Sequence, residues 1–122
     1  MLKKILLVDD DPGVHFVGTP ILTKLGYVVV SAKNGEQGLQ LALNERPDLI
    51  ILDVIMPGIK GRELCTKMKA YEVLKNIPII FLTAKDSDDD VKAELDAGAM
   101  AHLTKPIDPA QLTAIVKGAL GS

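Results

Sequence analysis

The sequence predicts an α/β fold, a doubly wound parallel sheet of five strands with helices on both of its faces. Short apolar runs alternate five times with segments whose apolar residues recur at helical spacing. The first four runs are apolar over four consecutive residues, which is typical of strands buried on both faces of a parallel sheet. The alternation favours such a sheet, because parallel neighbours need long crossover connections.

The predicted strands are short, aliphatic and bounded by polar residues. Because crossovers are right-handed, few arrangements of such strands remain. In each of them the functional crevice lies outside the carboxyl ends of the strands, where the winding reverses. In chain order the predicted strands are Ile5–Val8, Tyr27–Val30, Leu49–Leu52, Ile79–Leu82 and, more weakly, Ala101–Leu103.

The first two predicted helices have recognisable start signals. Pro12 suits the first turn of the first helix. Pro20 lies inside the same helix and removes a backbone hydrogen bond, so it predicts a kink or break near Gly18. The second helix is expected over about 36–44, with Asn34 as its N-cap.

Three further helices are expected in the second half of the chain. The third spans about Arg62–Leu74. The fourth spans about Asp88–Ala97, and Gly98, the next residue, ends it. The fifth has Asp108 as its N-cap and Pro109 at its first position, followed by an apolar stripe at helical spacing. The whole chain, 1–122, is therefore predicted to form one domain.

The composition excludes several function classes. Apolar residues make up 48% of the 122 residues, which is typical of a soluble globular domain. The net charge is −2 and no basic patch stands out, so direct nucleic-acid binding is not expected. The single cysteine, Cys65, fits a reducing compartment and a place in the core, and no stretch is long enough to span a membrane. A cytoplasmic location is predicted.

Polar residues follow the strands at the points where they should converge. Asp9 and Asp10 follow the first strand, and Asp53 ends the third. Thr83 follows the fourth strand, and Lys105 comes just after the fifth. A single aspartate after a strand is more often a turn or cap residue, but four core strands that all end in these residue types indicate a site.

The residue types at this edge point to a particular chemistry. Three neighbouring carboxylates repel one another unless a cation joins them or some are protonated. Oxygen ligands without histidine or cysteine favour Mg²⁺, which often bridges to phosphate oxygens. Lys105 and Thr83 could contact the other oxygens of a phosphoryl group, and a carboxylate could be the nucleophile. Asp11, directly before Pro12, is interpreted as a helix cap and left out of the site.

Together these motifs resemble the receiver domains of two-component response regulators, in particular the single-domain chemotaxis type. The resemblance covers essentially the whole chain. It implies a flavodoxin-like (βα)5 fold with strand order 2-1-3-4-5. The matching motifs are Asp9-Asp10 after an apolar strand, Asp53-Val-Ile-Met-Pro-Gly, Thr83-Ala, Gly98-Ala and Leu103-Thr-Lys-Pro.

The resemblance also implies roles for individual residues. Asp53 is the implied phosphoacceptor, which takes a phosphoryl group from a histidine of a sensor kinase or phosphotransfer protein. Asp10 and Asp53 are the implied direct Mg²⁺ ligands, with the backbone carbonyl of Ile55, and Asp9 is implied to act mainly through water. Thr83 is implied to hydrogen-bond to the phosphoryl group.

Further implied features concern the last strand and the output. Lys105 is implied to pair with the phosphoryl group, and the Lys105–Pro106 bond to be cis. The family signals through the face formed by the fourth helix, fifth strand and fifth helix. It acts on a protein partner or a fused output domain, and its members catalyse little beyond their own phosphorylation and slow dephosphorylation. Thr83 and the strand-five position occupied here by His102 are the implied switch residues.

Two departures leave alternatives open. His102 replaces the usual aromatic residue, so it is either a tolerated half-buried residue or a pH-sensitive element of the switch. Pro20 lies in a helix that contributes to kinase docking in the family.

A pseudo-receiver that binds partners without phosphorylation is one alternative function, and an Mg²⁺-dependent aspartyl phosphohydrolase is another. His15 could contact a partner, but it is interpreted as a solvated helix residue.

Overall fold

The computed structural model describes residues 2–56, 58, 60–84, 92 and 96–121. Within these residues five parallel strands form one sheet in the order β2-β1-β3-β4-β5, which confirms the predicted fold class and strand order. All pairings in the sheet are parallel, so the carboxyl ends of its strands lie along one edge. The strands are β1 (Lys4–Val8), β2 (Val28–Ala32), β3 (Leu49–Asp53), β4 (Ile79–Thr83) and β5 (Ala101–Thr104).

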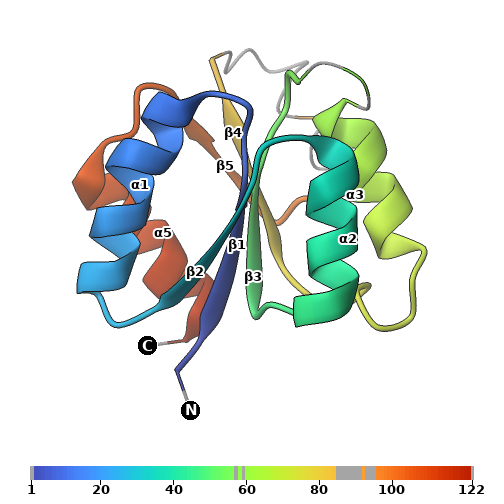
Figure 1. Ribbon diagram of the computed structural model, residues 1–122, viewed down its shortest axis with the longest axis horizontal. Coiled ribbons are helices and arrows are strands. Elements are labelled where there is room, and N and C mark those ends of the chain that lie inside the picture. Colours follow the sequence, from blue (N-terminus) through green and yellow to red (C-terminus); the bar gives the residue numbers. More distant parts are fainter. Residues whose placement is uncertain (1, 57, 59, 85–91, 93–95, 122) are drawn as a thin grey trace.

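Helices cover both faces of the sheet (Figure 1). On one face lie α1 (Pro12–Lys24) and α5 (Pro109–Leu120), and on the other lie α2 (Gly35–Glu45) and α3 (Gly61–Lys69). The predicted caps are confirmed where they can be seen, because Asn34 accepts the Gln37 N–H at 2.8 Å and Asp108 caps α5. The helix expected over 88–97 falls largely outside the described residues.

The core has two apolar layers that the sheet separates. On β1, Ile5 and Leu7 pack in the layer of α1 and α5, while Leu6 and Val8 pack in the layer of α2 and α3. Each of these four side chains is at most 1% exposed. This two-sided burial is the reason that the strand has no polar alternation, as the sequence pattern indicated.

The same interpretation holds only in part for the second strand. β2 lies at the edge of the sheet, where Val28 is exposed and Val29 and Val30 are only partly buried. Val29 packs against the layer of α1 and α5 and Val30 against the layer of α2 and α3, so both faces of β2 are covered, but less completely than those of β1. The end of β2 lies beside the end of β1, since Ala32 pairs with Val8, but β2 contributes none of the three clustered carboxylates.

Two predicted helix features also differ from the structure. The predicted break is absent, because α1 runs as one helix through Pro20, which is exposed. The third helix was predicted to reach Leu74 but ends at Lys69. Leu74 is buried as its spacing suggested, yet it reaches the core from a turn closed by its N–H bond to the Tyr71 carbonyl.

Candidate functional site

The sequence-predicted site residues lie at the carboxyl-end edge of the sheet. Asp9 follows β1, Asp53 ends β3 and Thr83 ends β4, and all three are buried. Lys105 follows β5, and its backbone N–H donates to the Thr83 carbonyl at 2.8 Å. Because β1 and β3 are neighbours although β2 lies between them in the chain, the winding reverses here, as in other doubly wound sheets with a binding crevice.

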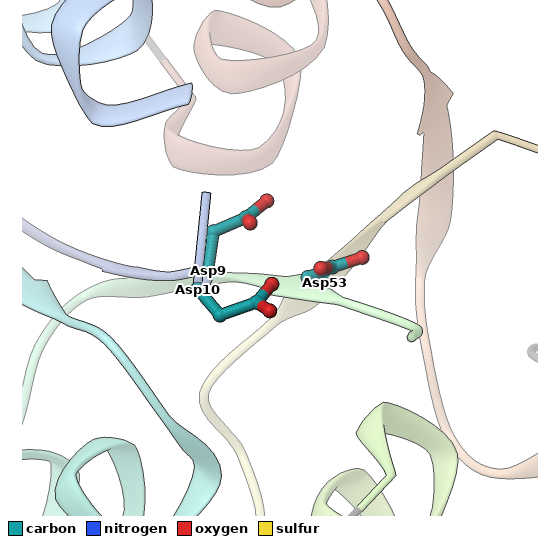
Figure 2. A group of neighbouring side chains, drawn as sticks. All are labelled: Asp9, Asp10 and Asp53. Atoms are coloured by element: carbon teal, nitrogen blue, oxygen red, sulfur yellow. The ribbon is translucent and has the colours of Figure 1, made fainter. Parts of the chain in front are cut away.

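Three carboxylates gather at this edge. Asp9, Asp10 and Asp53 each offer a carboxylate oxygen, and these oxygens lie within 4.8 Å of one another. Figure 2 shows Asp9 and Asp10 as neighbours after β1, with Asp53 beside them at the end of β3. Asp10 is exposed to solvent while the other two are buried, so the cluster opens outward on the side of Asp10.

Asp9 is held at several points. Its backbone N–H donates to the Ala32 carbonyl at 3.1 Å, which continues the pairing of β1 with β2. Its Oδ1 accepts the Asp11 N–H at 2.8 Å, and its Oδ2 forms an ion pair with Lys105 Nζ at 3.0 Å. Asp9 is therefore a fixed part of the site, whereas Asp11 caps α1 by accepting the Gly13 N–H, as predicted.

Lys105 connects the two buried carboxylates. Its Nζ lies 3.0 Å from Asp9 Oδ2 and 3.4 Å from Asp53 Oδ2. Burial lowers the pKa of Lys105, but the hydrogen bonds and negative charges of Asp9 and Asp53 outweigh this effect and raise the pKa above its usual value. The ammonium therefore stays charged. The Lys105–Pro106 peptide bond is cis, as the sequence resemblance implied.

The positive charge of Lys105 does not fully offset the burial of Asp53 and the negative charge of Asp9 beside it. Burial and the charge of Asp9 raise the pKa of Asp53 to about 6, against the Ile55 N–H and Lys105, which lower it. The Ile55 N–H donates to Asp53 Oδ1 at 3.2 Å. One ammonium does not neutralise three carboxylates, so the site fits a divalent cation that prefers oxygen ligands. The donor set contains no nitrogen or sulfur, which fits Mg²⁺ better than zinc.

Two other candidate residues lie away from this cluster. His102 on β5 is half-buried and lines a hollow of about 510 Å³ together with residues of α5 such as Gln111 and Ile115. Cys65 is fully buried, and its Sγ donates to the Ala97 carbonyl at 3.3 Å. Burial raises the pKa of the Cys65 thiol to about 11, so it is a core residue, as predicted, with no thiolate character.

His15 is a neighbour of the site that the sequence did not reveal. It was interpreted as a solvated helix residue, but it is half-buried and its Nε2 lies 2.8 Å from the Asp9 carbonyl oxygen. The contact joins α1 to the loop that carries the carboxylates. Only its position six residues after Asp9 could have suggested this, and that spacing alone is uninformative.

Comparisons with known proteins agree with this geometry. The family model of the response regulator receiver domain matches residues 5–117. A curated relative, the alkaline phosphatase synthesis transcriptional regulatory protein of Bacillus subtilis, is 40% identical over 98% of this chain and 49% of its own length. Sporulation initiation phosphotransferase F of the same organism is 37% identical over 96% of this chain and 93% of its own length.

A solved structure gives the same result at the level of the fold. The receiver domain of a Pseudomonas aeruginosa sensor histidine kinase, described with a magnesium ion in its active-site cleft, is 34% identical. Each chain covers 100% of the other, with a TM-score of 0.91.

The present chain spans only about half the length of the transcriptional regulators that it matches. In the described part of the chain, no helix is long and apolar enough to cross a membrane. The chain belongs to the response regulator receiver domains, the phosphoacceptor domains of two-component systems.

Proposed function

We propose that Asp53 accepts a phosphoryl group from a phosphohistidine of a sensor histidine kinase or phosphotransfer protein. The observation that carries this proposal is the placement of the Asp53 carboxylate within 4.8 Å of two other carboxylates, with Lys105 Nζ 3.4 Å away. A buried carboxylate beside a fixed ammonium can attack phosphorus while the ammonium neutralises the phosphoryl oxygens. Asp48, directly before the same strand, instead accepts the backbone N–H of Lys4.

The reaction requires little covalent chemistry from the protein. A carboxylate oxygen of Asp53 forms a bond to phosphorus as the P–N bond of the donor breaks, and the electron pair of that bond stays on the imidazole nitrogen. The product is an acyl phosphate on Asp53. Because the pKa of Asp53 is about 6, the nucleophilic carboxylate is the main form above that pH even without a metal. Catalysis then depends on position and charge.

The chain's own carboxylates supply the proposed Mg²⁺ site. Asp10 and Asp53 would hold the ion directly, with the Ile55 carbonyl, and Asp9 would act mainly through water. Bound Mg²⁺ supplies positive charge that draws the donor phosphoryl group in and balances charge that develops on its oxygens. Lys105 would pair with a further phosphoryl oxygen, and Thr83 would donate a hydrogen bond to another.

The proposed output is a shift between two conformations. Thr83 would move toward the phosphoryl group, and His102 would move behind it. This motion would change the face that the family resemblance assigns to the fourth helix, β5 and α5. Phosphorylation can act only by favouring one pre-existing state, and a shift from 1:99 to 99:1 needs about 5.5 kcal/mol of differential stabilisation.

The domain is proposed to be a switch and not a general enzyme. Residues 1–122 would form one receiver domain that works in the cytoplasm and catalyses only its own phosphorylation and slow dephosphorylation. Its output would be a protein partner or an output domain in the same polypeptide. Transcriptional regulators among the relatives support the second form, and the nearly full-length match to a phosphotransferase supports the first.

A mass measurement tests the acceptor directly. Incubation with acetyl phosphate and Mg²⁺ should add the mass of one phosphoryl group, and chelation of Mg²⁺ should prevent it. Asp53→Asn should abolish the addition, whereas the matched control Asp48→Asn, just before the same strand, should keep it. Phosphorylation that survives Asp53→Asn would contradict the proposal, and a protein that stays unmodified under all conditions would favour the pseudo-receiver.

A further inference from the structure

His15 makes an unusual contact with the backbone of the acidic loop. Its Nε2 lies 2.8 Å from the carbonyl oxygen of Asp9. A carbonyl oxygen can only accept, so Nε2 carries the hydrogen in this contact. Nδ1 of the same ring is buried and has no hydrogen-bond partner among the described residues. The ring therefore makes one directed interaction, and that interaction points to the site.

The carbonyl that His15 holds belongs to the peptide unit between Asp9 and Asp10. This unit is planar, so fixing its carbonyl oxygen also fixes the Asp10 N–H and the position of the Asp10 Cα. The Asp9 side of the unit is already held through its N–H, Oδ1 and Oδ2. The contact with His15 therefore adds its main constraint on the Asp10 side.

Asp10 needs such a constraint more than its neighbours do. Its carboxylate is exposed, and within the described residues no hydrogen bond or ion pair holds it. Asp53, in contrast, accepts the Ile55 N–H and faces Lys105. Figure 2 shows Asp10 directly after Asp9, with its carboxylate in the same group as that of Asp53. Among the described residues, it is therefore the local backbone that directs the Asp10 side chain toward this group.

We infer that His15 is a positioning residue that aims the Asp10 carboxylate at the proposed cation site by holding the Asp9–Asp10 peptide. This inference rests on the proposed function, because it gives His15 a role in the Mg²⁺ site of that function. His15 touches neither the cation nor the phosphoryl group. Groups that orient the direct ligands of a metal typically change its affinity by about 10- to 100-fold when they are removed.

Titration with MgCl₂ of the unphosphorylated protein tests the inference without any transfer reaction. His15→Ala removes the donor and should weaken Mg²⁺ binding by about tenfold. His15→Gln places an amide N–H at a similar reach and should restore most of the affinity. The control Phe16→Ala truncates the next residue on α1, which is 82% exposed, and should bind Mg²⁺ like the wild type.

A second measurement in metal-free buffer reads the peptide itself. In ¹H–¹⁵N spectra, His15→Ala should shift the Asp10 amide resonance and speed its hydrogen exchange, and His15→Gln should reverse both changes. A role confined to overall stability would instead lower the melting temperature without a selective effect on Asp10, and rescue by Gln would fail.

The outcomes separate the two levels of the proposal. Wild-type Mg²⁺ affinity in His15→Ala, or an unchanged Asp10 amide in that variant, would overturn the role of His15 and leave the acceptor site standing. Equal weakening by His15→Ala and His15→Gln would also overturn it, because the donor would then not matter. A wild-type protein that binds no Mg²⁺ while the Asp10 amide responds as expected would refute the proposed cation site alone.

Discussion

Strand β3 begins next to one aspartate and ends in another, and the two have opposite surroundings. Asp48, just before the strand, accepts the backbone N–H of Lys4 at 2.8 Å, while Lys4 Nζ pairs with Glu45 at 3.0 Å. These groups are partly or largely exposed. At the amino-end edge of the sheet, each acidic side chain therefore has its own donor and access to water.

At the carboxyl-end edge, Asp53 and Asp9 are buried and share a single ammonium. The raised pKa of Asp53 shows that its charged form is destabilised here, because a well-paired carboxylate would have a pKa below its ordinary value. One end of the strand is arranged for stability, and the other carries uncompensated negative charge. Such charge is unfavourable for folding but favourable for binding a cation and then a phosphoryl group.

The largest expected effect comes from removing the shared cation of the carboxyl-end edge. Lys105→Met leaves Asp9, which is 0% exposed, and Asp53 without their only cationic partner among the described residues. We expect the free energy of unfolding at pH 7 without Mg²⁺ to fall by about 3 kcal/mol. Urea denaturation measures this loss, and saturating Mg²⁺ should restore part of it because a second cation then occupies the cluster. A loss no larger than that of Lys4→Met would remove the contrast between the two edges.

A smaller effect of opposite sign is expected from Asp53→Asn. The pKa of Asp53 is raised from 3.8 to about 6, so the folded state binds this proton more tightly than the unfolded state does. The charged carboxylate therefore destabilises the fold, and this destabilisation grows as pH rises from about 4 to about 6 and is complete above that range.

Asn removes the charge and should stabilise the metal-free protein by about 2 kcal/mol at pH 8, with the gain vanishing near pH 4. Thermal unfolding at both pH values measures it. Asp48→Asn is the matched control and should be neutral or destabilising at both. A gain for Asp53→Asn that is independent of pH would mean that relief of charge is not its cause.

Mg²⁺ should stabilise the folded protein through the same cluster. At tenfold excess over its dissociation constant, a ligand that binds only the folded state adds about 1.4 kcal/mol to the free energy of unfolding. This increment should disappear in Asp10→Asn and persist in Asp48→Asn, as followed by the melting temperature with and without MgCl₂. Persistence in Asp10→Asn would place the ion elsewhere.

The carboxyl-end edge could be predicted from sequence because its residues follow apolar runs, strongly apolar before Asp9, Asp53 and Thr83 and weaker before Lys105. The position of a strand end is local information, and the parallel sheet then brings Asp9, Asp53, Thr83 and Lys105 to one edge. By contrast, the apolar run of β2 does not reveal that it is an edge strand, because edge position depends on the order of the whole sheet.

Other features were missed for similar reasons. α3 ends at Lys69, where the side-chain Nζ of Lys69 donates to the carbonyls of Lys75 and Ile77 at 3.1 and 2.7 Å. The His15 contact depends on the path of the loop between β1 and α1. Neither leaves a periodic signal in the sequence, because periodicity reports which face is buried and not which polar atoms meet.

The smallest expected effect belongs to the amino-end edge. Lys4→Met removes the ion pair between Lys4 and Glu45, whose side chains are 33% and 40% exposed respectively. The substitution leaves the Lys4 backbone N–H, which donates to Asp48. Exposed pairs contribute about 0–1 kcal/mol, since water and salt already solvate both charges. We therefore expect the free energy of unfolding to fall by less than about 1 kcal/mol, and the change to shrink further at high salt.

Glu45→Gln should give a loss of similar size, and the double variant should lose little more than either, as expected for partners in one pair. A salt-insensitive loss as large as that of Lys105→Met would show that the amino-end edge is also under electrostatic strain, and the two ends of β3 would then not differ in kind.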